Sequence, residues 1–276
     1  IKSLELYIDI LTVMGEQSRA LEKARAAFAL IEAQDEEWMA QNWKQSVSVL
    51  RTIAWAERRC GNPEQGLVAI RKAELLAQPH QDEIESISAH VATLYRIAAE
   101  IQLEDGALDE AMEWIRRAVI AAGEAPQFRD DTLRIQLAFS CSVRARVLAA
   151  MGGPGEAVDW FAQAHKELEG ISNPSARTHA MAGVYYHQSF TANRTEAVSW
   201  ASKSLEAYQS LAAAFPERWR RRVAEAHVFL AGRMRDAGMA SEAAAQYGEC
   251  LAFLADDESE FARKLRGQIE SALSAA

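Results

Sequence analysis

Residues 106–118 have the sequence Gly106-Ala-Leu-Asp-Glu-Ala-Met-Glu-Trp-Ile-Arg-Arg-Ala118. We expect the glycine to end one helix and a second helix to open, after a short turn, with the Glu-Ala pair. Ala111 and Ala118 are seven residues apart, so they lie on nearly one face of the second helix. A neighbouring helix can approach closely over these two alanines, while Trp114 and Ile115 fill the flanking grooves.

The same pattern occurs six times along the chain. Each copy has a turn residue, a small residue five positions later, and a second small residue seven positions after that. In chain order these residues are Gly15/Ala20/Ala27, Gly61/Gly66/Ala73, Gly106/Ala111/Ala118, Gly152/Ala157/Ala164, Ala192/Ala197/Ser204 and Gly238/Ala243/Cys250. No large side chain occurs at any of the twelve small positions, and the copies recur about every 45 residues. This regularity indicates a repeat protein built from helix pairs.

The pattern resembles the tetratricopeptide repeat (TPR) family. In that family a small residue late in a first helix precedes a glycine-containing turn and two alanines seven residues apart. Seven residues before the six turns stand Ile8, Ala54, Ala99, Ala145, Tyr185 and Ala231. The usual TPR unit has 34 residues. The longer period here is similar to that of long-helix variants, such as the sensor arrays of bacterial transcription regulators.

The repeat and the resemblance together predict an all-α fold, a right-handed superhelical α-solenoid of six antiparallel helix pairs with a C-terminal capping helix. We expect a single array over 1–276, in which each unit contacts only its neighbours. The expected units are 1–33, 34–78, 79–123, 124–170, 171–214 and 215–255, and the expected capping helix is 256–276. Within the second unit, the sequence predicts one long helix from about Asp35 to Arg59.

Composition limits the classes of function. The net charge of −9 and the pI near 5.3 argue against a general nucleic-acid binder, which needs a basic face to displace phosphate counterions. The three cysteines show no CxxC spacing and favour a reducing compartment. The sequence contains no run of 18 apolar residues, the length that would predict a membrane span. We therefore expect a cytoplasmic protein. Because the chain begins at Ile1, inside an expected helix, we also expect it to be a fragment of a longer one.

The sequence predicts neither a catalytic site nor a metal-binding site. The loop Gly152-Gly-Pro-Gly155 lacks the Lys-Ser/Thr of a phosphate-binding loop and falls at a repeat turn. No two histidines stand four residues apart, and His179 and His187 fit half-exposed helix positions. The run Arg218-Trp-Arg-Arg-Arg222 fits a solvated helix start better than a phosphate or partner patch. We predict a protein that is not an enzyme and needs no cofactor or metal.

The candidate site comes from the resemblance to the TPR family, in which first helices line a concave groove. Groove positions lie thirteen, ten, six and three residues before each turn residue. In the middle units these positions include arginines that can bind carboxylates and aromatic residues that can hold apolar side chains. The predicted groove residues are Arg51, Trp55, Arg58, Arg96, Glu100, Phe139, Arg146, His179 and Tyr186.

The alternative is that these arginines pair internally, with glutamates such as Glu57 and Glu100, and leave a neutral wall. The asparagine of chaperone-tail-binding TPRs is missing at the positions nine residues before the turns. We predict a scaffold that binds a protein or peptide, acidic or amphipathic, which could belong to the same protein. The competing hypothesis is a sensor or autoinhibitory arm of a larger bacterial transcription regulator or signalling ATPase. Neither hypothesis involves a membrane or direct contact with nucleic acid.

Overall fold

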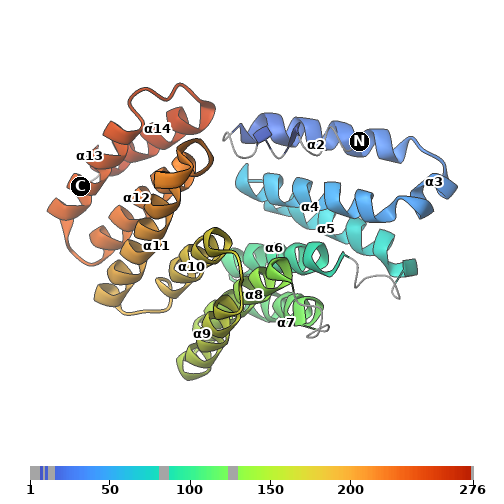
Figure 1. The fold of residues 1–276 in the computed structure, drawn as a ribbon, viewed down its shortest axis with the longest axis horizontal. Helices are drawn as coiled ribbons and strands as arrows, with labels where there is room; N and C mark the ends of the chain where they lie inside the picture. Colours follow the sequence, from blue (N-terminus) through green and yellow to red (C-terminus); the bar gives the residue numbers. More distant parts are fainter. Residues whose placement is uncertain (1–6, 9, 12–15, 81–86, 124–129, 275–276) are drawn as a thin grey trace.

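A computed structural model describes residues 7–8, 10–11, 16–80, 87–123 and 130–274. Over these residues the regular structure is helical throughout, without a strand, which confirms the predicted all-α solenoid (Figure 1). The helices are α2 (Gln17–Glu32), α3 (Glu36–Gln41), α4 (Trp43–Arg59), α5 (Pro63–Ala77), α6 (Ser88–Asp105), α7 (Leu108–Gly123), α8 (Asp131–Ala150), α9 (Pro154–Glu169), α10 (Pro174–Gln188), α11 (Arg194–Ala214), α12 (Pro216–Asp236), α13 (Ala240–Phe253) and α14 (Glu260–Ser274).

The helices pack as successive pairs. Helices α4 and α5, α6 and α7, α8 and α9, α10 and α11, and α12 and α13 pack against each other within pairs. The first helices of the pairs also contact one another in turn, from α4 to α6, α8 and α10. The last helix, α14, packs on α13 and α12 and buries Phe261, Leu265 and Ile269 there.

The twelve small positions of the repeat are all buried. Close packing explains why they are small. A Cβ atom added to Gly66 would lie 3.2 Å from Ala54 O and 3.2 Å from Ile101 Cδ1, so even an alanine would crowd its neighbours. Ala111 and Ala118 of α7 are both fully buried, as the spacing predicts. Cys250, which occupies a small position of the repeat, and Cys141 are fully buried as well.

Four repeat turns need glycine. Gly61, Gly106, Gly152 and Gly238 have φ values of 84°, 80°, 89° and 80°, a left-handed conformation that costs other residues about 1–2 kcal/mol. The fifth turn, at Ala192, is built differently, since α10 ends at Gln188 and α11 begins at Arg194. Here Asn193 caps α11 by accepting a hydrogen bond of 3.0 Å from the Glu196 backbone N–H. The predicted turn at Gly15 lies outside the described residues.

Asn42 interrupts the long helix predicted from Asp35 to Arg59. Helix α3 ends just before it and α4 begins just after it. The Asn42 side-chain Nδ2 donates a hydrogen bond of 2.9 Å to the Trp38 carbonyl oxygen. An asparagine side chain that binds nearby backbone offers the chain an alternative to a regular helix, which the hydrophobic pattern alone does not reveal. In the predicted units 1–33 and 79–123, residues 1–6, 9, 12–15 and 81–86 lie outside the described residues.

The two ends of the array meet. Ser18 Oγ on α2 donates a hydrogen bond of 2.7 Å to Glu260 Oε1 on α14, and Figure 1 shows one end of α14 facing one end of α2. Arg59 on α4 forms an ion pair with Glu225 on α12, a residue 166 positions further along the chain. The expectation that each unit contacts only its neighbours is therefore wrong, because the array curves enough to close. We call these two interactions the end contact.

Candidate functional site

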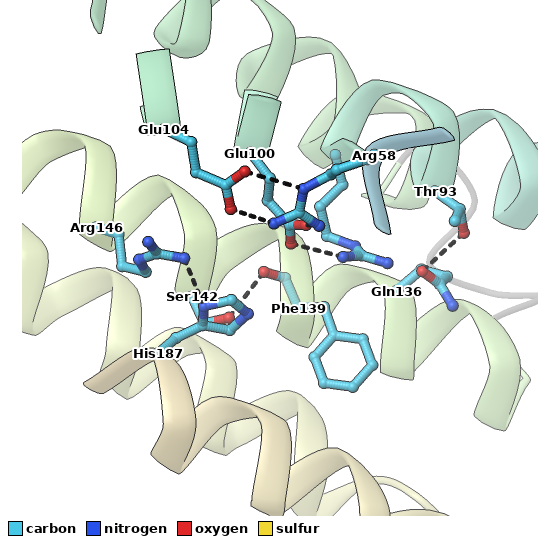
Figure 2. A network of polar contacts seen from close by, with 10 residues as sticks. Arg58, Thr93, Glu100, Glu104, Gln136, Phe139, Ser142, Arg146 and His187 are labelled. Atoms are coloured by element: carbon cyan, nitrogen blue, oxygen red, sulfur yellow. Dashed lines mark hydrogen bonds and ion pairs between the residues drawn. The ribbon is translucent and has the colours of Figure 1, made fainter. Parts of the chain in front are cut away.

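The predicted groove residues lie on α4, α6, α8 and α10, and α12 adds further residues to the same surface. We call this surface, formed by the first helices of the pairs, the inner wall. At its centre, Glu100 of α6 pairs with Arg58 of α4 (Figure 2). Glu100 also pairs, at 2.7 Å, with Arg96 on its own helix. Glu104 binds another edge of the Arg58 guanidinium, whose Nε donates a hydrogen bond of 3.3 Å to Glu104 Oε2.

Glu100 is a buried charge that depends on its partners. Only 5% of its side chain is exposed. Burial on its own would raise the pKa of Glu100, but the charges of Arg58 and Arg96 lower it to about 2. In the same way, burial disfavours the charged form of Arg58, and Glu100 and Glu104 outweigh it and raise the pKa of the guanidinium. For Arg58 and Arg96, internal pairing was therefore the better of the two sequence-based interpretations.

Arg146 of α8 is in a different position from these two arginines. Among the described residues, no carboxylate lies within ion-pair distance of it. Its Nη1 lies 3.2 Å from His187 Nδ1, as Figure 2 shows. Burial, then the charge of Arg146, lowers the pKa of His187 to about 3, so the ring is neutral and Nδ1 accepts from the guanidinium. Burial also lowers the pKa of Arg146 itself.

Three aromatic rings stand beside Arg146. Tyr186 of α10 and Phe190 of the turn that follows α10 have ring centroids 5.1 Å apart, and Phe229 of α12 lies 4.4 Å from the first and 5.4 Å from the second. The Arg146 guanidinium stacks over Phe190 at 4.2 Å. Tyr186 and Phe190 stay 37% and 39% exposed. Tyr186 is nevertheless close to Arg58, Arg146 and Glu100, whose charges all act on its hydroxyl.

A second charged cluster, formed by residues of α4 and α12, surrounds Glu225. Its carboxylate pairs with Arg59 of the end contact and accepts hydrogen bonds from Arg221 (3.1 Å) and Arg222 (3.0 Å). Burial would raise the pKa of Glu225, but Arg222, Arg59 and Arg221 lower it to about 2. The prediction that the run 218–222 is a solvated helix start is wrong, because Trp219 is buried against His179 and Tyr208 and Arg221 is buried beside Glu225.

The remaining predicted residues are divided between the wall and the core. His179 lies 4.9 Å from the Trp219 ring and 6.2 Å from that of Phe139, and burial, then the charges of Arg222 and Arg218, lowers its pKa to about 4. The Phe139 ring also lies 5.5 Å from the Arg96 guanidinium.

Trp55 packs against the hydrophobic core near α4, with the Arg59 guanidinium 5.7 Å from its ring. Arg51 is half-buried near His90, whose pKa burial and the Arg51 charge both lower. Glu57, the other glutamate considered as a partner for the wall, binds Arg25 of α2 instead.

Several residues of the wall were missed by the sequence analysis. Glu225 stands thirteen residues before Gly238, so the groove spacing selects it once it is extended to the sixth unit. Phe190 lies in the shortened fifth unit, where the spacing fails. His187 was expected to be half-exposed, and its burial at 7% exposure corrects that prediction.

Neither a metal site nor a membrane-spanning helix is present among the described residues. These residues include no group of three or more His, Cys, Asp or Glu side chains that could hold a metal ion. None of the described helices is long and apolar enough to cross a membrane.

The fold and the site together define an all-α solenoid whose inner wall combines arginines with exposed aromatic rings. No protein-family model matches the chain, and no curated protein matches it. Among solved structures, the chain is similar to BtubC (BKLC) from P. vanneervenii, with 15% sequence identity and a TM-score of 0.48. That similarity covers 88% of this chain and 89% of the other. At this level of similarity, nothing about the present chain follows from that protein.

Proposed function

We propose that the chain is a non-enzymatic TPR-like scaffold whose inner wall binds an acidic or amphipathic peptide of a protein partner. The observation that carries the proposal is the charge of the wall. The whole chain has a net charge of −9, yet among the described residues of the wall, arginines outnumber the carboxylates beside them. Arg58 and Arg96 pair with Glu100, Glu104 also binds Arg58, and Arg146 lies near both glutamates. Arg59 and Arg222 share Glu225.

The exposed rings support the same function. A scaffold of repeats holds side chains at fixed spacing without doing chemistry, so its function depends on the surface residues that it presents. Tyrosine, phenylalanine and arginine side chains that stay partly exposed on a rigid wall are typical of the residues that dominate binding energy. Electrostatic attraction to the wall would also speed the encounter with an acidic segment, and salt would weaken it.

We expect a selection from random twelve-residue peptides to enrich sequences that combine Asp or Glu with aromatic or large aliphatic residues. Variant Arg146→Glu should bind the enriched peptides at least about tenfold more weakly, since it reverses a charge on the wall. Variant Arg71→Glu, with the same charge change at an exposed position of α5, should bind as the wild type does. Calorimetry at two salt concentrations measures the affinities of the wild type and both variants for the enriched peptides. Enrichment of basic peptides, no enrichment at all, or equal binding by both variants would refute the proposal.

A further inference from the structure

We propose that Arg146 and Arg233, with the rings of Tyr186, Phe190 and Phe229, form one subsite. It would accept an aromatic or large aliphatic side chain that is next to an aspartate or glutamate in the bound peptide. This inference rests on the proposed function and adds to it the chemical pattern that the wall recognises. The two arginines come from α8 and α12, and the rings come from α10 and α12 and the turn that follows α10.

The apolar half of the subsite is the triangle of rings. Each ring lies within 4.4 to 5.4 Å of the other two, which fixes their positions. More than a third of both Tyr186 and Phe190 remains exposed. A guest side chain packed on these rings would remove their apolar surface from water, which favours binding by roughly 25 cal/mol for each Å² that is buried.

The charged half consists of the two guanidiniums that flank Phe190, Arg146 at 4.2 Å and Arg233 at 4.9 Å from its centroid. A guanidinium stacked on a ring keeps its edge for hydrogen bonds to a carboxylate. Arg146 donates to the neutral His187 ring. Arg233 meets Asp236 only at 3.5 Å, where that carboxylate is 54% exposed, and its Nε has no hydrogen-bond partner among the described residues.

The charge balance favours a single carboxylate as the anion. Arg58 and Arg96 share Glu100, and Glu104 also binds Arg58. Among the described residues, these pairs leave Arg146 without a carboxylate at ion-pair distance, and burial lowers its pKa although Glu100 and Glu104 are close enough to act against that change. A carboxylate in a forked hydrogen bond would supply the missing partner. A phosphate group, with close to two negative charges, would also face repulsion from the nearby glutamates.

The test uses blocked synthetic hexapeptides in which a central Phe-Asp, Phe-Asn or Gly-Asp pair is flanked by glycines, with the full chain as the receptor. Calorimetry should show that the Phe-Asp peptide binds at least about tenfold more tightly than the Phe-Asn or the Gly-Asp peptide. Variant Arg146→Gln should lose the preference for Asp over Asn, and Arg71→Gln should keep it. Thermal unfolding serves as the folding control, and we expect Arg146→Gln to be no less stable than the wild type, because it removes a buried charge that lacks a carboxylate partner.

Two results would overturn the subsite. One is equal binding of the Phe-Asp and Phe-Asn peptides to the wild type, and the other is an unchanged preference for Asp in Arg146→Gln. A peptide with phosphoserine in place of Asp should bind more weakly than Phe-Asp, and tighter binding would contradict the assignment of a carboxylate. If longer selected acidic peptides still bind the wall in either case, only the subsite fails. If no acidic peptide binds, the proposed function fails with it.

Discussion

Variant Glu100→Gln should lose about 3–5 kcal/mol of unfolding free energy, the usual cost of removing one partner from a buried ion pair. The glutamine keeps the shape of the side chain but leaves the Arg58 and Arg96 guanidiniums, only 20% and 15% exposed, without their shared carboxylate. Denaturant unfolding monitored by circular dichroism measures the loss. Glu104→Gln on the same helix is the matched control, and its loss should stay below about 1 kcal/mol, because that carboxylate is 53% exposed.

The same residue predicts how stability depends on pH. The pKa of Glu100 in the folded chain is about 2, below its ordinary value of 4.5. A carboxylate whose pKa is depressed by folding contributes stability above its unfolded pKa and loses it as the pH falls toward its folded pKa. Stability should therefore decline between about pH 4.5 and pH 2, and the decline should be shallower in Glu100→Gln. Equal slopes for the two proteins, or equal losses from the two glutamine variants, would show that the pair is not buried as described.

Variant Glu225→Arg should open the end contact. The substitution places a fourth guanidinium among Arg59, Arg221 and Arg222, where like charges repel instead of pairing. Since the contact between α4 and α12 depends on this carboxylate, the ends of the array should separate. Small-angle X-ray scattering should then give a larger radius of gyration than for the wild type. The exposed Glu113→Arg on α7 makes the same charge change and should leave the radius unaltered. An unchanged radius in Glu225→Arg would mean that other contacts hold the ends together.

Much of the fold was predictable because the positions that repeat are those where helix packing requires a small residue. A helix pair that packs closely needs a small residue where backbones meet, so buried positions such as Ala111 and Ala118 follow from spacing alone. The closure of the array did not follow, since it depends on small rotations that accumulate over successive units. The break at Asn42 was missed for a local reason, because one side-chain hydrogen bond overrides the hydrophobic pattern there.

The site was predictable only in part. The spacing placed Arg58, Arg146 and Tyr186 on one surface, but it could not say which arginines were already paired. In the structure, Glu100 and Glu104 stand 42 and 46 residues after Arg58, close to one repeat period. A search for opposite charges one period apart would therefore have found these pairs. It would not have found Glu225 beside Arg59, because that pair exists only when the ends meet.

The most direct test of the inner wall as the binding surface measures how tightly one selected acidic peptide binds two variants, each with one side chain replaced by alanine. Tyr186→Ala removes an exposed ring from the inner wall, and Leu75→Ala removes a more exposed apolar side chain, 68% accessible, from α5. Calorimetry should show about a tenfold or larger loss for Tyr186→Ala and no change for Leu75→Ala. Loss of binding in Leu75→Ala, with Tyr186→Ala unaffected, would contradict the assignment and place the binding surface on the second helices.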